Sequence, residues 1–150
     1  MFDLDLSLAV VHHIIILALF AVLAAELLLI RPGMTAADVG RVGVIDGWYG
    51  ALAVAILAVG FGRAVFAAKG WEYYSANPYF HVKLGAFVVV GLLSIIPTAK
   101  IIAWRRRQKI DATAAPALPE ITLVRRAVWA EVFLFLLMPA FAAAMARGSV

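Results

Sequence analysis

Long apolar runs separated by short polar connections dominate the pattern of this chain. Four runs are long enough for a transmembrane helix, which needs about 20 mainly apolar residues. Helix breakers mark two boundaries, because Arg31-Pro32-Gly33 closes the first run and Asn77-Pro78 opens the third. The pattern predicts an all-α integral membrane protein, a single domain folded as a four-helix transmembrane bundle. Its spans are expected at about residues 6–30, 42–66, 79–104 and 121–145, with an aromatic-rich loop at residues 69–78.

The composition supports this class and excludes several others. Of the 150 residues, 65% are hydrophobic and 15% are charged, whereas soluble domains contain about 45–50% apolar and about 25% charged residues. A water-soluble enzyme, a disordered chain and a nucleic-acid-binding domain are therefore excluded. The absence of cysteine excludes disulfides, thiolate metal sites and iron–sulfur clusters. The first run is too long, and the residues before it too acidic, for a cleavable signal peptide.

Basic residues are concentrated around two of the three connections. Since cytoplasmic loops carry an excess of Lys and Arg, we expect both of these connections in the cytoplasm. Both termini would then lie in the periplasm, in a multi-pass protein of the bacterial inner membrane. Nine of the 13 basic residues form this pattern: Arg31, Arg41, Lys100, Arg105, Arg106, Arg107, Lys109, Arg125 and Arg126.

Ionisable side chains inside the runs are the most informative positions, because they are costly in a membrane and usually face the bundle interior. The expected orientation sorts these residues by depth. The outer half of the bundle would hold the basic residues His12, His13, Arg63, His81 and Lys83. The inner half would hold the acidic residues Glu26, Asp46 and Glu131. The sequence thus predicts an outer basic cluster and an inner acidic cluster.

Helical phase, at about 100° per residue, indicates which of these side chains face inward. His12 and Glu26 are 14 residues apart and share one face of the first helix, whereas His13 is rotated away from that face. Lys83 is expected to face inward, because its face carries the small and polar residues Gly91, Ser94 and Thr98. The face of His81 is mostly apolar, so His81 is expected at the membrane interface. Glu131 aligns with Phe135 and Met138 and is also expected to face inward.

These residue types indicate a haem b site. Imidazole is the commonest metal ligand in proteins, and haem iron is commonly held by histidine. His12 or His13 would hold the iron, Arg63 would neutralise the propionates, and Lys83 would be a second ligand or a carboxylate partner. Glycines on the second and third spans would make room for the macrocycle: Gly47, Gly50, Gly60, Gly62, Gly85 and Gly91.

Short motifs along the whole chain carry a resemblance to known membrane proteins. They are Val11-His12-His13-Ile14-Ile15, Glu26, Arg31-Pro32-Gly33, Asp46-Gly47-Trp48-Tyr49-Gly50, Asn77-Pro78-Tyr79-Phe80, Ser94-Ile95-Ile96-Pro97-Thr98 and Ala146-Arg147-Gly148. Together they resemble a bacterial family of predicted membrane proteins filed as domain of unknown function 2214. The resemblance implies a membrane protein and brings no assigned activity.

A more distant resemblance concerns the third span. Phe80-His81-Val82-Lys83-Leu84 is similar to a motif of HemJ-type protoporphyrinogen oxidases, and His13 followed by Phe20 and Arg31 is similar to their opening helix. This resemblance implies haem b held by His13 or its neighbour His12, with Lys83 as the functional lysine. It also implies a porphyrinogen substrate whose electrons pass to a quinone or a partner protein. CopD-like copper-export domains are similar in overall plan.

Three functions follow from these observations. The first is a haem b-binding membrane protein, which as an enzyme would be a haem-dependent oxidoreductase. In this protein Glu26, Asp46 and Glu131 would form a proton path toward the cytoplasm. The second is a component of copper or other transition-metal transport or resistance. Its metal ligands would be drawn from His12, His13, His81, Met138 and Met145.

The third function is a structural or assembly subunit without a cofactor. In this case the buried charges pair with each other, Glu26 with Arg31 and Asp46 with Arg41. A homodimer is also expected, because four short spans can barely enclose a macrocycle. Its contact surface would be the Gly-rich second and third spans.

Overall fold

The computed structural model describes residues 4–66 and 70–146, and these form four long helices and one short helix. No strand occurs in these two described stretches, which confirms the all-α class. The helices are α1 (Leu4–Leu29), α2 (Ala36–Phe66), α3 (Gly70–Ala76), α4 (Pro78–Gln108) and α5 (Leu118–Ala146).

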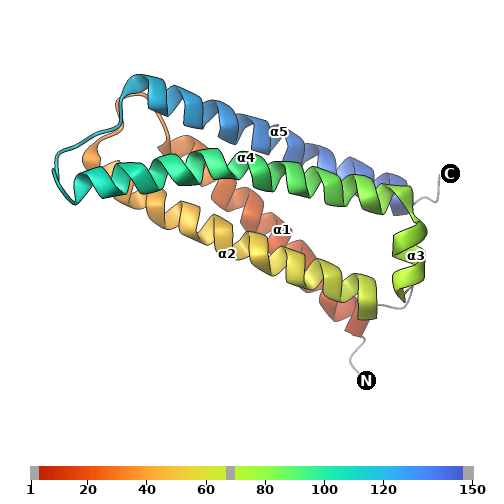
Figure 1. Cartoon of the computed structure of the whole chain (residues 1–150). Helices are drawn as coiled ribbons and strands as arrows, with labels where there is room; N and C mark the ends of the chain where they lie inside the picture. Colours follow the sequence, from red (N-terminus) through yellow and green to blue (C-terminus); the bar gives the residue numbers. More distant parts are fainter. Residues whose placement is uncertain (1–3, 67–69, 147–150) are drawn as a thin grey trace.

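The long helices pack as two antiparallel hairpins. One hairpin is α1 with α2 and the other is α4 with α5, while α2 also packs on α4 and α1 on α5 (Figure 1). The hairpins lie close together at the end that carries the α1–α2 and α4–α5 connections, and they diverge toward the other end. The short helix α3 lies across that diverging end and contacts α2 and α4. This arrangement is the predicted four-helix bundle.

Among the described residues, three helices are long and apolar enough to cross a membrane: α1, α2 and the part of α4 from Phe80 to Gln108. They correspond to the first three predicted spans. The helix α5 has 29 residues and carries Arg125, Arg126 and Glu131 in its first half. Its crossing of the membrane stays a prediction, as does the side on which the termini lie. The two connections rich in Lys and Arg do lie at one common end of the bundle (Figure 1).

The helix boundaries differ from the expectation at two places. The helix α2 begins at Ala36, several residues before the predicted span, because Asp38 closes a capping box with Thr35. The Asp38 Oδ2 atom accepts hydrogen bonds from the Thr35 backbone N (2.8 Å) and from Thr35 Oγ1 (3.0 Å). The region expected as an aromatic-rich loop contains α3 instead. The start of α4 at Pro78, directly after Asn77, is as predicted.

The connection between α1 and α2 turns at a single glycine. Gly33 has a φ of 78°, a backbone conformation that glycine adopts without a steric penalty. The turn follows Arg31 and Pro32, as the sequence predicted, and it lets Ile30 and Met34 both point into the core, where both are buried.

Polar contacts fasten the helices together at the end with the basic connections. The Glu120 carboxylate on α5 accepts a hydrogen bond from Arg107 Nη2 (2.6 Å) and lies 3.6 Å from Lys100 Nζ, both on α4. The Arg107 hydrogen bond lowers the pKa of Glu120 below its usual range. Gln108 Nε2 donates to the carbonyl oxygen of Ala36 (2.7 Å), which joins the end of α4 to the start of α2.

Arg125 joins α5 to the last turn of α1. Its Nη1 donates to the carbonyl oxygens of Leu27 (3.0 Å) and Ile30 (2.6 Å). The last carbonyls of a helix have no partner within the helix, and they lie at the negative end of the helix dipole. A guanidinium satisfies both requirements. In the sequence Arg125 counted only as one of the basic residues that indicate orientation, whereas the structure gives it a packing role.

Arg125→Leu should lower the free energy of unfolding by about 1.5–3 kcal/mol, the usual contribution of hydrogen bonds to a charged group. Denaturant titration of the detergent-purified protein measures this loss. Arg126→Leu is the matched control, since Arg126 is the exposed neighbouring residue on the same helix. Equal losses of unfolding free energy in both variants would show that the hydrogen bonds from Arg125 to the end of α1 contribute no more than an exposed arginine does.

Candidate functional site

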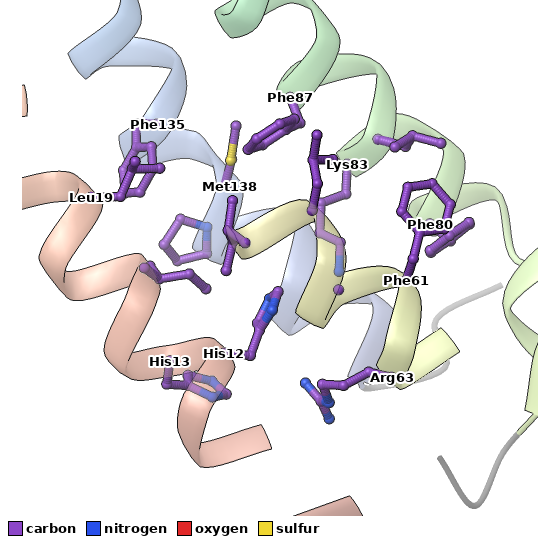
Figure 2. A pocket seen from close by; sticks show the side chains of 16 residues that line it. His12, His13, Leu19, Phe61, Arg63, Phe80, Lys83, Phe87, Phe135 and Met138 are labelled. Carbon is purple, nitrogen blue, oxygen red and sulfur yellow. The ribbon is translucent and has the colours of Figure 1, made fainter. Parts of the chain in front are cut away.

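A cavity of about 520 Å³ lies where the two hairpins diverge. Cavities that bind small molecules range roughly from 300 to 1,000 Å³. All four long helices line the cavity, mainly with apolar side chains such as Leu19, Ile56, Phe61, Phe87 and Phe135. The nitrogen-bearing side chains His12, His13, Arg63 and Lys83 also line it (Figure 2). These four are the members of the predicted basic cluster that line the cavity.

His12 is half-buried in the cavity wall. Its imidazole makes no hydrogen bond, and its Nδ1 atom is fully buried without a partner. The accessible ring nitrogen is therefore Nε2. The ring packs against Gly60 of α2, where a Cβ atom would stand 3.5 Å from His12 Cε1. A glycine at this position lets the imidazole lie against the backbone of α2.

His13 has a different environment. It is exposed, and its Nδ1 lies 2.7 Å from the carbonyl oxygen of Ala9, one turn earlier in α1. The two imidazole rings are 6.1 Å apart and nearly perpendicular. The sequence left open whether His12 or His13 faces a ligand in the bundle. The geometry favours His12, the residue that helical phase also placed on the inward face.

Arg63 and Lys83 give the cavity a positive charge. Arg63 lies at the end of α2, and its Nη2 is 3.8 Å from Oδ1 of Asp5. Lys83 has no ion pair or hydrogen bond within the described part of the chain. Both cations act electrostatically on His12, and Arg63 acts on Lys83. An apolar cavity with two cations and an imidazole that has no hydrogen-bond partner suits an apolar ligand that carries acidic groups.

His81 lies outside the cavity, as its apolar helix face indicated. It is exposed, and its Nε2 lies 2.8 Å from the carbonyl oxygen of Ser75, which attaches α4 to α3. Of the expected copper ligands, His12, His13 and Met138 line the cavity and His81 does not. The side chain of Met145 lies outside the described residues. The described side chains contain no group of three or more His, Cys, Asp or Glu placed to hold a metal ion.

The glycines expected to make room for a macrocycle do so at one position only. Gly60 lines the cavity. A Cβ atom at any of the other five would meet nothing within 4 Å, so these glycines border open space rather than the cavity; they are Gly47, Gly50, Gly62, Gly85 and Gly91. The proposed homodimer contact through these positions stays a prediction.

The predicted acidic cluster lies in the other half of the bundle. Glu26, Asp46 and Glu131 come from α1, α2 and α5, and all three are buried. Tyr49 donates a hydrogen bond to Glu131 Oε2 (2.8 Å), and Thr98 donates one to Asp46 Oδ1 (2.6 Å). These two hydroxyl partners were not recognised as site residues, although Tyr49 follows Asp46 by three residues and so lies on the same helix face.

The ion pairs expected in a purely structural subunit are not formed. No ion pair joins Glu26 to Arg31 or Asp46 to Arg41. Arg41 instead lies 3.5 Å from Asp38, three residues earlier in the same helix. The reason is direction, since Asp46 points into the bundle while Arg41 is exposed.

An apolar layer separates the cavity from the acidic cluster. Leu19 and Leu23 lie between His12 and Glu26 on the inward face of α1, and they are 1% and 0% exposed. Leu19 also lines the cavity from α1, and Ile56 and Phe135 line it from α2 and α5. The bundle thus contains two polar regions with packed side chains between them.

Lys83→Met should raise the free energy of unfolding by about 1 kcal/mol in the protein without ligand, because it removes a partly buried cation that has no acidic partner. Denaturant titration measures the change. Lys100→Met is the control, since Lys100 is paired with Glu120 and its loss should leave stability unchanged or reduced. If Lys83→Met lowers the free energy of unfolding instead, Lys83 has a stabilising role in the protein without ligand.

Comparison with known proteins adds a family and no activity. Residues 4–149 match the family described as "Predicted membrane protein (DUF2214)". No curated protein and no solved structure matches the chain. The match covers both the cavity and the acidic cluster, and it agrees with the motifs that first indicated this relationship. The chain therefore belongs to the family of predicted membrane proteins called domain of unknown function 2214.

Proposed function

We propose that this protein binds haem b in the cavity, where His12 would hold the iron, and acts as a membrane oxidoreductase. The observation that carries the proposal is that the His12 imidazole lies in the cavity wall without a hydrogen-bond partner. Its imidazole is half-buried, makes no hydrogen bond and keeps Nε2 accessible in a cavity with mainly apolar walls. A polar ring in such a place lacks a partner, and iron is a partner that a neutral imidazole binds well.

The remaining lining residues fit a large, flat ligand with acidic groups. Aromatic rings from three helices supply apolar walls, namely Phe61, Phe80, Phe87 and Phe135. Arg63 and Lys83 line the cavity (Figure 2), and they would neutralise two carboxylates, which is the usual role of such cations beside haem propionates. Removing charged groups from water is costly unless each is paired, so these cations and the carboxylates would stabilise one another.

Each residue would have a defined part in the bound state. A bound haem supplies one-electron redox chemistry. His12 would fix the position of the ligand, Arg63 and Lys83 would fix its orientation, and the phenylalanine rings would exclude water. Leu19 and Leu23 would keep the ligand from the acidic cluster.

The resemblance of Phe80-His81-Val82-Lys83-Leu84 to the HemJ motif supports a more specific version of this proposal. In this version the substrate is a porphyrinogen, the electron acceptor is a quinone or a partner protein, and Lys83 binds a substrate carboxylate. The placement of Lys83 in the cavity and of His81 outside it agrees with that division of roles. Both the substrate and the acceptor belong to the proposal.

The test is an absorption spectrum of detergent-purified protein from haem-replete cells, oxidised and then reduced with dithionite, together with a pyridine haemochrome assay. We expect a Soret band and b-type reduced peaks in the wild type and their loss in His12→Ala. His13→Ala and His81→Ala are matched controls that should keep the spectrum. Circular dichroism establishes that each variant is folded.

Two results would contradict the proposal. A colourless wild-type protein would exclude haem b and leave the structural subunit as the better explanation. A spectrum that His12→Ala leaves unchanged and His13→Ala abolishes would move the ligand to His13 and remove the argument from the unpartnered imidazole.

A further inference from the structure

The acidic cluster has a feature that the proposed function does not use. Three carboxyl groups from three helices are buried together: Glu26 is 1% exposed, Glu131 is 1% exposed and Asp46 is 9% exposed. Asp46 and Glu131 both act electrostatically on Glu26. None of the three forms an ion pair within the described part of the chain.

Within residues 4–66 and 70–146, no cation compensates this charge. The groups that act on the three carboxyls are one another, Tyr49 of α2 and Thr98 of α4, and no basic residue is among them. The guanidinium of Arg125, on the same helix as Glu131, is engaged by the last carbonyls of α1. Three carboxylates in an apolar interior would each carry a large desolvation penalty and would repel each other. A buried carboxyl in this position loses its charge by binding a proton.

The hydrogen bonds of the acidic cluster also indicate a missing proton, because the cluster has fewer donor hydrogens than acceptor oxygens. The hydroxyl hydrogens of Tyr49 and Thr98 are already donated, to Glu131 and Asp46. The Oε1 atoms of Glu26 and Glu131 are both enclosed and have no partner. A carboxylate can only accept hydrogen bonds, whereas a protonated carboxyl also donates one. The network therefore lacks a hydrogen, which a bound proton would supply.

We infer that Glu26, Asp46 and Glu131 form a proton-binding site that holds at least one proton at neutral pH. Tyr49 and Thr98 orient the acceptor oxygens of Glu131 and Asp46, and both of these carboxyls act electrostatically on Glu26. A metal ion is not favoured as the occupant, because these carboxyls do not form a metal-binding group of three among the described side chains.

The position of the site determines which end of the bundle it serves. Leu19 and Leu23 separate it from the cavity, and Glu26 lies about one turn from the end of α1. The site therefore exchanges its proton with the end that carries the basic connections. The inference does not depend on haem, because its evidence lies entirely on the other side of the apolar layer.

Infrared spectroscopy of the detergent-purified protein at pH 7 tests the inference, because a protonated carboxyl has a C=O stretching band distinct from that of a carboxylate. The wild type should show this band, with the shift in D₂O that an exchangeable proton produces. Glu26→Gln, Glu131→Gln and Asp46→Asn retain the shape of each side chain, and at least one should abolish the band. Glu120→Gln is the matched control and should leave it unchanged, since Glu120 is held ionised by Arg107.

The wild-type spectrum alone can overturn the inference, so a variant that fails to fold does not block the test. A folded wild type without the band at pH 7 would show three ionised carboxyls and no bound proton. A band that persists in all three variants would place the proton elsewhere. Recording the infrared spectrum of the protein with and without haem b separates this result from the haem proposal. The band of the protonated carboxyl should be the same in the two samples.

Discussion

The structure depends on one constraint: within a membrane every backbone polar group must find its partner inside the protein, and every buried charge is costly. Helices satisfy the backbone along their length, and only their ends need outside partners. Arg125 meets this need at the end of α1 by reaching across from α5, and Gln108 links the end of α4 to the start of α2. These contacts hold the two hairpins together at one end of the bundle, and the hairpins diverge at the other.

The divergence creates the cavity, and the apolar layer below it gives the bundle two separate polar regions. Basic side chains gather in the open half and acidic ones in the closed half, with Leu19 and Leu23 packed between them. Each region contains buried polar atoms without partners, Nδ1 of His12 in one and the Oε1 atoms of Glu26 and Glu131 in the other. Such atoms reduce stability, and they are the observations on which the ligand proposed for the one region and the proton proposed for the other are based.

The predictions from sequence that failed have separate physical causes. Charges a few residues apart were expected to pair, but Asp46 and Arg41 point in different directions from one helix. The glycines were expected to surround a cofactor, but all except Gly60 border open space, because a glycine carries no side chain whose polarity reveals the direction it faces. The helix α3 was expected as a loop, since its seven residues are too few for a periodic pattern to be recognised.

The sequence by itself determined the class, the four long helices and the inward direction of His12, Glu26, Lys83 and Glu131. Hydrophobic run length and helical phase are properties of a single helix, and they require no knowledge of its neighbours. Only the tertiary structure decided which side chains meet: Tyr49 with Glu131, Thr98 with Asp46, and Arg125 with the end of α1. Such contacts depend on the rotation and depth of one helix against another, and these are set by packing over the whole interface rather than by any local pattern.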